Sequence, residues 1–583
     1  MASAARKRYV VGRRWAIGQA DPSVLRRLES DGTVSPLLAR VLAGRSLTTP
    51  QAARSFLESR LADLLSDPFA LRDMDKAADR VAEAVRKHES IAVFGDYDVD
   101  GITATVLLLR LLRWLGSDPV YYIPHRVNEG YGLSCDAIDL LAGKGIRLLI
   151  TVDNGITSLD EVDHATSLGL DCVVTDHHLP GPTLPRASAV VDPHRPDCAY
   201  PFPHLSGVGV AFKLAHAVLR RLEVEGSDGK AFLTAQLDLV ALGTVADVVP
   251  LTGENRALVR AGLARLEQTE NAGLAALLEL CDCDTRPFPA DTITFYLAPR
   301  LNAAGRTEHA SLAVELLLTP DRNRAADLAH QLDQLNDRRR AVERRIFEEG
   351  LTLIRHQCDM EKDLLYIVLG QQWHLGVIGI VASKLSDHFG RPVVVLSEFD
   401  GTVRGSARST PRFDIHAALT RCTDLLQTFG GHAQAAGLSL SADRVQSLRE
   451  RLNAIAAESL RDEQEVEELT VDSACEAEDL TLDAVKDLQA LEPCGYGNPS
   501  PLFALLNVDL IREPRVVGTS HLKLLVAAGH QDFDVIGFGM AGAINDLRQI
   551  AGPIDIAFRP VISEWGGTPR VELQLCDFRP SEA

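Results

Sequence analysis

The 583-residue chain lacks the features that mark membrane and secreted proteins. No stretch approaches the roughly 20 consecutive apolar residues that a membrane-spanning helix needs, and the mean hydropathy is +0.01. Basic residues near the start, such as Arg8 and Arg13, are not followed by an apolar core, so we expect no signal peptide. The ten cysteines are scattered and form no C-x-x-C pair, which favours reduced thiols and a cytoplasmic protein.

Motifs of several enzyme classes are also missing. There is no G-x-x-x-x-G-K-[ST] loop, which argues against an ATP-driven motor, and no H-E-x-x-H motif, which argues against a zinc protease. Residues 207–212 (G-V-G-V-A-F) lack the third glycine of a dinucleotide-binding fingerprint, so we discard that match.

The net charge of −20 argues against a protein that coats nucleic acid nonspecifically. It does not exclude a nucleic-acid enzyme, because binding depends on local patches. One basic cluster comprises Arg338, Arg339, Arg340, Arg344 and Arg345. Much of the acid is concentrated in residues 462–479, which we interpret as part of a solvated linker.

Short apolar segments followed by acidic or imidazole residues are the most informative feature that is present. Residues 91–94 precede G-D-Y-D-V-D-G (95–101), residues 148–152 precede Asp153, and residues 172–174 precede T-D-H-H (175–178). A fourth carboxylate, Asp247, follows the apolar run 239–246. We interpret all four apolar segments as strands.

Strand ends of an open parallel sheet line one edge, where ligands bind, so these groups are expected to meet in space. Any one cluster alone is equally well explained as a turn or a helix N-cap. Three aspartates within five residues repel one another unless a cation lies among them, however. Oxygen ligands with one or two imidazoles suit Mn²⁺ or Mg²⁺, and shared carboxylates can hold two such ions to hydrolyse phosphodiesters.

The pattern along the chain predicts an α/β protein with three folded domains. Strands alternate with helices from about residue 75 to 280, residues 324–350 predict a long exposed helix, a second α/β unit follows, and short strands near the end predict an OB-type β-barrel. We expect six parts: an N-terminal segment (1–74), an α/β catalytic domain (75–320), a connecting helix (321–350), a second α/β domain (351–460), an acidic linker (461–484) and the barrel (485–583).

The second α/β unit, and the part of the chain that precedes it, contain cationic and glycine-rich motifs. These are R-G-S-A-R-S (404–409), read as a loop, F-G-G-H (429–432), read as a tight turn, and R-L-N-A-A-G-R (300–306), placed at a domain junction. Arg126 follows another strand end. Arginines at such places can bind a phosphate bidentately, although a solvent-facing arginine pair or a plain hairpin explains each motif alone.

Taken together, these motifs resemble those of the DHH phosphoesterases. GDYDVDG, V-D-N-G (152–155), D-H-H (176–178) and A-D-V-V-P-L (246–251) are similar to the four motifs of the DHH catalytic domain. R-L-N-A-A-G-R, G-V-I-G-I-V-A-S-K-L (376–385), R-G-S-A-R-S and F-G-G-H-A-Q-A-A-G (429–437) are similar to the DHH-associated domain. E-P-C-G-Y-G-N-P-S-P-L-F (492–503) resembles the entry to the OB domain of the three-domain exonucleases in this family. The resemblance covers about residues 75–580.

The resemblance implies a 5′→3′ exonuclease on single-stranded DNA that uses two Mn²⁺ or Mg²⁺ ions and releases 5′-mononucleotides in DNA recombination and repair. Asp98 and Asp153 would hold one ion, and Asp153 would bridge to the other. The second ion's remaining ligands would be Asp100, His177 and Asp247, with Asp96 assisting and His178 facing the scissile phosphate. Candidates for holding the substrate are Arg126, Arg306, Ser406, Arg408 and His432.

Two alternatives stay open at this point. A smaller relative of the same superfamily would cleave short oligonucleotides or cyclic dinucleotides, but would not need a third domain. A non-catalytic replication scaffold of the same fold would not need intact aspartates and D-H-H. A helicase and a single-strand-binding protein are partners that the resemblance alone suggests.

Overall fold

The expected parallel sheet is present in the computed structural model. The strand order is β3-β2-β4-β5-β6, and all neighbouring strands run parallel. Every residue of β2 and β4 is buried, as in sheets that helices cover on both faces. The strands are β2 (Ile91–Phe94), β3 (Val120–Tyr122), β4 (Leu148–Val152), β5 (Asp171–Thr175) and β6 (Ala189–Val191).

The structure describes residues 13–581 except 31, 33, 127, 225, 284–286, 400, 461–467 and 564–566. Within the described part, no helix has the length and apolar character to cross a membrane. The chain forms two compact units. The larger comprises residues 65–250 and 258–464, and the smaller comprises residues 1–64, 251–257 and 465–583.

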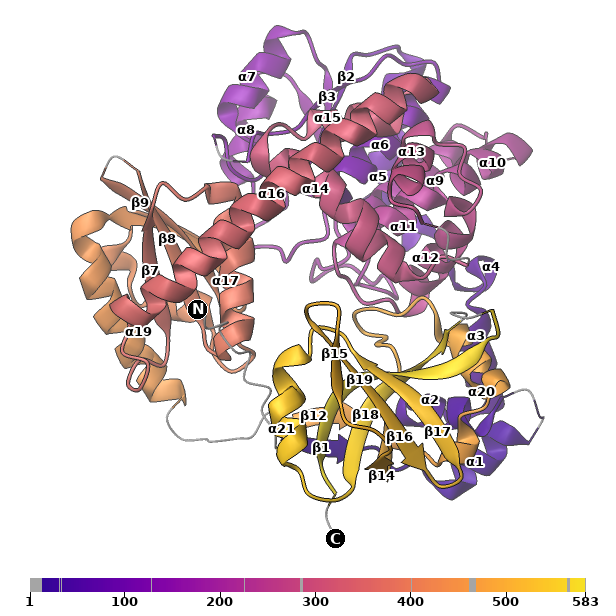
Figure 1. Cartoon of the computed structure of the whole chain (residues 1–583). Helices are drawn as coiled ribbons and strands as arrows, with labels where there is room; N and C mark the ends of the chain where they lie inside the picture. Colours follow the sequence, from indigo (N-terminus) through magenta and orange to yellow (C-terminus); the bar gives the residue numbers. More distant parts are fainter. Residues whose placement is uncertain are drawn as a thin grey trace. The chain divides into compact units, whose positions relative to one another are not determined.

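Helices cover both faces of the parallel sheet (Figure 1). α7 (Cys135–Gly143) and α8 (Leu159–Ser167) share an apolar core with one face. α5 (Met74–Arg86), α6 (Val99–Trp114) and α9 (Gly207–Arg221) pack on the other. The rest of this domain is helical: η1 (Pro68–Ala70), α10 (Ser227–Ala235), α11 (Leu237–Ala246), α12 (Gly253–Leu266), α13 (Ala272–Leu280), η2 (Thr292–Leu297), α14 (Ala298–Thr307) and α15 (Ser311–Leu318).

The strand expected at residues 239–246 is wrong, because this run is the helix α11. A mainly apolar run of eight residues fits a buried strand and a helix buried on all sides equally well. α11 packs between α6 and α9, and its Gly243 allows that close approach because a Cβ there would lie 2.3 Å from the Thr103 hydroxyl. Asp247 is therefore the C-cap of a helix and not a strand-end residue.

A long helix leads from the parallel sheet to a second, mixed sheet (Figure 1). α16 (Arg322–Gln357) is longer than the connecting helix expected at 321–350. The sheet order is β10-β11-β9-β8-β7, and only β7 and β8 are parallel. Its elements are β7 (Tyr366–Gln371), α17 (Leu375–Phe389), β8 (Val393–Phe399), β9 (Thr402–Arg408), α18 (Ile415–Thr420), η3 (Thr423–Leu425), β10 (Thr428–His432), β11 (Ala435–Ser441), η4 (Ala442–Arg444) and α19 (Val445–Leu460).

Two local expectations for the cationic motifs are wrong. R-G-S-A-R-S is mostly strand β9, and F-G-G-H lies in strand β10. R-L-N-A-A-G-R lies in helix α14, and its Arg306 donates to the Gly376 carbonyl oxygen of α17. Its place at a domain junction stays a prediction. β9 alternates buried residues such as Val403 and Ala407, which pack in the core, with polar residues on the other face. Its short apolar side chains conceal the alternation that marks a half-buried strand.

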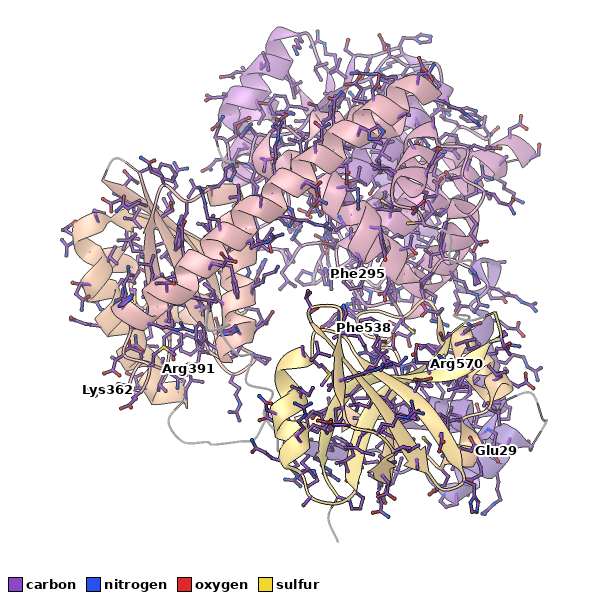
Figure 2. All side chains as sticks on the ribbon, viewed as in Figure 1. Glu29, Phe295, Lys362, Arg391, Phe538 and Arg570 are labelled. Atoms are coloured by element: carbon purple, nitrogen blue, oxygen red, sulfur yellow. The ribbon has the colours of Figure 1, made fainter. Side chains whose placement is uncertain are left out.

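The smaller unit contains a closed five-stranded barrel, as the OB-type pattern predicts. β14, β18, β19, β17 and β16 are neighbours in that order, and β16 pairs back to β14. Phe538 and Arg570 project from its surface (Figure 2). The strands are β13 (Ser473–Ala474), β14 (Phe503–Leu510), β15 (Arg515–Val517), β16 (His521–Ala528), β17 (Gln531–Gly537), β18 (Ile554–Ser563) and β19 (Arg570–Pro580). Between and around them lie η5 (Ala477–Asp479), α20 (Leu482–Leu488), η6 (Gln489–Leu491), η7 (Ala541–Ala543) and α21 (Ile544–Gln549).

The described residues among 13–64 of the N-terminal segment and 468–484 of the acidic linker are folded parts of this unit. β1 (Arg14–Ile17) pairs with β12 (Glu468–Val471), so the described part of the segment expected as a solvated linker is not one. The other N-terminal elements are α1 (Pro22–Glu29), α2 (Pro36–Gly44), α3 (Pro50–Glu58) and α4 (Leu61–Leu64). α1 and α2 bury Leu28, Leu37 and Leu42 in the barrel's core. Residues 461–467 of the expected linker lie outside the described residues.

Candidate metal centre and anion site

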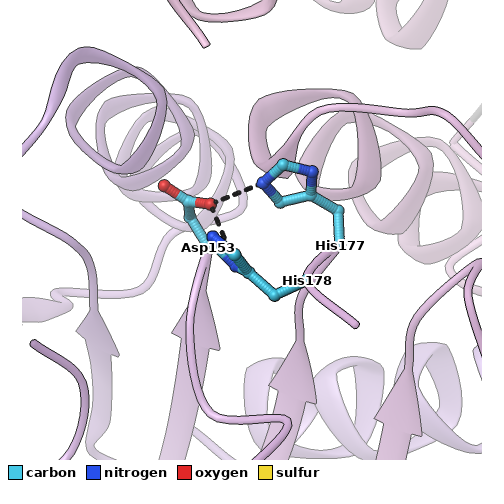
Figure 3. A group of neighbouring side chains, drawn as sticks. All are labelled: Asp153, His177 and His178. Atoms are coloured by element: carbon cyan, nitrogen blue, oxygen red, sulfur yellow. Dashed lines mark ion pairs between the residues drawn. The ribbon is translucent and has the colours of Figure 1, made fainter. Parts of the chain in front are cut away.

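The carboxyl edge of the parallel sheet brings together the acidic and imidazole groups that the sequence analysis selected. His177 Nε2 lies 3.0 Å from Asp153 Oδ1, 3.5 Å from Asp247 Oδ2 and 3.8 Å from Asp100 Oδ2. Figure 3 shows both His177 and His178 directed toward Asp153, beyond the ends of the strands. Asp247 joins this cluster even though it follows a helix, because the C-terminus of α11 points to the same edge.

Asp153 is shared between two neighbouring groups of side chains. Asp153 forms one group with Asp96 and Asp98 and another with His177 and His178, and within each group the ligand atoms lie within 4.8 Å of one another. A third such group, formed by Asp100, His177 and Asp247, shares His177 with the second. Asp153 has a left-handed backbone conformation (φ 62°), which aspartate tolerates and which is frequent at functional sites. This turn directs its carboxylate between the two groups.

Backbone hydrogen bonds hold two of the aspartates in place. Asp98 is the N-cap of α6, and its Oδ1 accepts from the backbone N–H groups of Asp100 and Gly101. Asp100 accepts from Gly207 N at 2.6 Å and Val208 N at 2.8 Å, at the start of α9. The last two aspartates of D-Y-D-V-D are therefore bound to the first turns of two helices, whose N-termini favour negative charge.

Glycines make room for this crowded acidic edge. A Cβ at Gly207 would lie 2.7 Å from Asp153 Cβ, and a Cβ at Gly101 would lie 2.6 Å from Asp96 N. Gly207 begins the G-V-G segment that was discarded as a nucleotide fingerprint. Its role is close packing against the site, and no motif in the sequence distinguishes that role.

Burial and mutual repulsion disfavour the charged form of the aspartates. Burial, followed by the charge of Asp98, raises the pKa of Asp100 to about 7. Burial first, and then neighbouring aspartates, raise the pKa of Asp96, Asp153 and Asp247 well above its usual range. Burial and the nearby His178 lower the pKa of His177 to about 3, which keeps its imidazole neutral and able to act as a ligand.

The residues fit a site for hard divalent cations. Within the described part of the chain, four buried atoms directed into this cluster lack a hydrogen-bond partner: Asp96 Oδ1, Asp153 Oδ1, Asp247 Oδ2 and His177 Nε2. Unsatisfied buried acceptors are unfavourable, and cations would satisfy all four at once. Carboxylate oxygens with one imidazole and no thiolate match the ligand preferences of Mn²⁺ and Mg²⁺.

His178 differs from its neighbour in both surroundings and charge. Its Nδ1 lies 2.8 Å from Asp176 Oδ1, 3.1 Å from the Tyr131 hydroxyl and 4.0 Å from Asp153 Oδ1. Burial opposes the charged form, but the hydrogen bond and charge of Asp176 outweigh it and raise the pKa of His178 to about 9. His178 is therefore a partly exposed imidazolium at the mouth of the cluster.

Residues behind the two histidines were missed by the sequence analysis. Asp176 also accepts from the backbone N–H groups of His177 and Ile156, so it orients the loop as well as the ring of His178. His194 Nδ1 lies 2.7 Å from the His177 carbonyl oxygen, and Asp192 accepts from His194 N. The available signal was another acidic motif after a strand, D-P-H-R (192–195), which follows β6.

Three predicted substrate-binding arginines form a cationic group within the same unit. Arg126 lies over the Tyr97 ring, with Cζ 4.7 Å from its centroid. Burial, followed by the charges of Arg126 and Arg339, lowers the pKa of Arg306 to about 10. Burial and the charge of Arg126 also lower the pKa of Arg408. Neither Arg306 nor Arg408 has a carboxylate partner among the described residues, so an anion would find unpaired guanidinium groups here.

The two remaining predicted residues lie on the mixed sheet. Ser406 accepts from Arg408 Nη1 at 2.9 Å, and a Cβ on the neighbouring Gly379 of α17 would touch both side chains. His432 pairs with Ala435, which pairs with Arg408, so these residues form one row across the sheet. Facing residues of antiparallel strands share a face, and two strand spacings place His432 about 10 Å from Arg408. His432 thus lies on the same face of the sheet as Arg408.

Three family models match the chain in the order that the motifs predict. The DHH family, N-terminal domain matches residues 90–244, the DHHA1 domain matches residues 361–458, and the RecJ OB domain matches residues 471–577. The single-stranded-DNA-specific exonuclease RecJ of Bacillus subtilis is 39% identical over 573 residues, which cover 98% of this chain and 71% of that protein. The RecJ of Escherichia coli is 36% identical over 583 residues, covering 95% of this chain and 99% of that protein.

The chain belongs to the RecJ family.

Solved RecJ structures agree with this assignment. RecJ of Thermus thermophilus in complex with Mn²⁺ matches with a TM-score of 0.83 and 32% identity, over 98% of this chain and 80% of that one. Its complex with Mg²⁺ matches with a TM-score of 0.77 and 30% identity, over 98% and 79%. The expected architecture of DHH, DHH-associated and OB domains is thereby confirmed, although the OB match begins at residue 471 and not at the expected 485.

Proposed function

We propose that this protein is a single-stranded-DNA-specific exonuclease that depends on Mn²⁺ or Mg²⁺, degrades strands from the 5′ end and releases 5′-mononucleotides. The observation that carries the proposal is the buried group of carboxylates and one neutral imidazole whose unpartnered atoms converge around Asp153. Relatives named single-stranded-DNA-specific exonuclease, with identities of 36–39% over nearly the whole chain, support it.

Two cation sites sharing Asp153 account for the arrangement. Asp98 and Asp153 would hold one ion, with Asp96 assisting. Asp100, His177 and Asp247 would hold the other together with Asp153. Ions held by these residues would supply activation of water and neutralise the charge that develops on the attacking and leaving oxygens.

The chain's own residues supply orientation and charge. The N–H groups of Gly207 and Val208 fix the Asp100 carboxylate, so it cannot turn away from the cluster. His178, held protonated by Asp176, donates toward a non-bridging oxygen of the scissile phosphate and stabilises its growing charge. Preorganised donors of this kind lose little in reorganisation when the reaction occurs.

The cationic group would receive the 5′ end. A terminal phosphate carries more charge than an internal diester, and guanidinium groups bind it bidentately. Arg126, Arg306 and Arg408, with Ser406 and His432 on the neighbouring sheet, would hold this phosphate while the first phosphodiester lies at the metal centre. This placement explains why one nucleotide is removed at a time.

Digestion of end-labelled strands tests polarity and product. A single-stranded oligonucleotide labelled at either end is incubated with the full chain and Mn²⁺. We expect labelled mononucleotide to appear at once from the 5′ label and only late from the 3′ label. Early release of the 3′ label would contradict the polarity, and a labelled dinucleotide as first product would contradict the site geometry.

The barrel would hold the incoming strand by base stacking and phosphate contacts, whose strength falls with salt. Because β1 and α1–α3 are built into the smaller unit, the comparison requires a fragment of residues 65–464 and not a C-terminal truncation alone. We expect this fragment to cleave very short oligonucleotides like the full chain and to degrade long strands at least about tenfold more slowly at moderate salt. Equal rates on long strands would refute the role of the barrel.

A role in DNA recombination and repair, with a helicase that supplies single strands and a single-strand-binding protein that covers them, is part of this proposal. This part of the proposal rests on the substrate, because a helicase would generate the single-stranded DNA that the enzyme degrades. Co-purification of each partner with the full chain in the presence and absence of DNA distinguishes direct contact from a shared substrate.

A further inference from the structure

A basic groove runs along α16 beside α17, on the larger unit. Its lining residues on α16 come at helical spacing, and α17, which packs against α16, supplies the other wall. We call it the α16 groove, and it is lined mainly by Arg339, Arg340, Arg344, Phe347, Ile380 and Lys384. Neither the relatives nor the metal centre described above account for it.

Two of its arginines have no acidic partner within the described residues. Glu343, the one acid in the lining, is already engaged by Arg339 at 3.0 Å and by Lys384. Arg340 and Arg344 remain exposed and unpaired, four residues apart and therefore on one side of the helix. The half-buried ring of Phe347 follows Arg344 by three residues and lies on the same side.

The α16 groove adjoins a second hollow that lies close to the metal centre. This cavity, of about 210 Å³, has Arg339 and Ile380 in the wall that it shares with the groove. Its other lining residues include Val245 and Val248, on either side of Asp247 in the sequence, and Arg306 of the cationic group. The two neighbouring hollows therefore extend from the surroundings of Asp247 and Arg306 to the open face of α16.

The inner cavity carries positive charge. Arg306 and Arg339 both line it, and burial, together with the charges of Arg126 and Arg339, lowers the pKa of Arg306. Arg339 pairs with Glu343, but its buried Nε has no acceptor among the described residues. A buried donor without an acceptor is unfavourable, and an anion in the cavity would supply one.

We propose that the α16 groove binds a nucleoside 5′-monophosphate, the product of the reaction, on its way out of the site. This inference rests on the proposed function, because hydrolysis must supply that product. The unpaired Arg340 and Arg344 would hold the phosphate dianion, and Phe347 would pack against the base. Such an exit lets one nucleotide leave while the shortened strand still occupies the entrance.

The dimensions favour one nucleotide over a longer strand. From Arg340 to Phe347 the helix rises about 10 Å, which is room for a single nucleotide. Tracks for single strands carry successive aromatic platforms, whereas Phe347 is the one aromatic residue that lines this groove. Two adjacent arginines also suit a terminal dianion better than spaced diesters.

Equilibrium dialysis of labelled deoxyadenosine 5′-monophosphate against the full chain tests the proposal. EDTA is present to prevent hydrolysis, and a saturating 5′-phosphorylated 12-mer occupies the strand site. We expect one monophosphate still to bind per chain. The double variant Arg340→Glu/Arg344→Glu should weaken this binding at least about tenfold.

The variant Arg338→Glu/Arg345→Glu is the matched control. It makes the same two charge reversals on the same helix with residues outside the groove lining, and its binding should stay within about twofold of the parent. Equal weakening in both double variants, displacement of the monophosphate by the 12-mer, or equally tight binding of deoxyadenosine without phosphate would each overturn the proposal. Failure of the proposed function would appear separately, as the absence of strand hydrolysis by the parent chain with Mn²⁺.

Discussion

In the parallel sheet of the larger unit the functional side chains follow the ends of buried strands, whereas in the mixed sheet they stand within the strands. Asp153 comes directly after β4, which is buried along its whole length. Ser406 and Arg408 alternate with the buried Val403 and Ala407 inside β9. The aspartates at the carboxyl edge of the parallel sheet are buried together. The polar and cationic side chains of the mixed sheet lie on a partly exposed face.

The two regions also differ in what they need from a ligand. The aspartates repel one another, so their charged state depends on bound cations. Arg306 and Arg408 have no carboxylate partner among the described residues, so a bound anion would balance their charge. Once cations neutralise the acidic edge, it would accept a phosphodiester. The cationic face beside it would accept the terminal phosphate that neighbours this phosphodiester. The four predictions below test this contrast, beginning with the largest expected effect.

Loss of the shared carboxylate should be the most damaging change at the acidic edge. We expect Asp153→Ala to lower hydrolysis at saturating Mn²⁺ by at least about a thousandfold, because both cation sites lose a ligand at once. Circular dichroism and thermal melting serve as controls for folding. Activity above a few per cent of the parent would refute the bridging role, and an unfolded variant would indicate a structural one.

The two adjacent histidines should separate binding from turnover. His178→Ala should reduce kcat by about a hundredfold or more while leaving Mn²⁺ affinity close to the parent, because His178 is held by Asp176 and acts as a cation. His177→Ala should weaken both. Calorimetric Mn²⁺ titration and turnover measured on each variant decide the matter, and equal losses of affinity would contradict the division of roles.

The cationic face should control the choice of strand end and not the metal. Arg126→Ala should lose most of the preference for a 5′ phosphate over a 5′ hydroxyl, by about tenfold or more, with Mn²⁺ affinity unchanged. Competition between the two labelled substrates measures the preference directly. If Arg126→Ala keeps the full preference, the pocket lies elsewhere, and Arg306 or Arg408 is the next residue to change.

Metal-free stability should fall with rising pH, and Asp100 at the acidic edge should account for part of this fall. Asp100 has a folded pKa of about 7, above its unfolded value. The stability it contributes is therefore fully present below pH 4 and is lost as the pH rises through 7. In EDTA we expect Tm to fall by several degrees more between pH 5.5 and 8.5 in the parent than in Asp100→Asn.

Mn²⁺ should reduce this dependence of Tm on pH, since it stabilises the charged carboxylates. Ser406→Ala on the mixed sheet is the control, and its slope of Tm against pH should match the parent. A parent whose Tm does not change with pH in EDTA would show that the aspartates do not repel one another in the folded protein.

Local pattern was sufficient for the parallel sheet and its acidic edge. Each of its strands is a short apolar run with a polar end, and parallel strands must present those ends together. One expected strand, residues 239–246, is the helix α11. Asp247 still lies in the same cluster, because the helix also ends at this edge of the sheet.

Sequence by itself therefore determined the chemistry of this protein: the acidic groups, the imidazoles and the order of the three domains. Only the tertiary structure decided which glycines make room for Asp153 and that β1 and α1–α3 belong to the same unit as the barrel. It also decided that Asp176 raises the pKa of His178, whereas burial lowers the pKa of His177. These features depend on residues far apart in the chain, and on burial and distance. A local sequence pattern gives neither burial nor distance. The same side chain could therefore be a metal ligand, a helix cap or a solvated charge, and only the packing of the folded chain determines which it is.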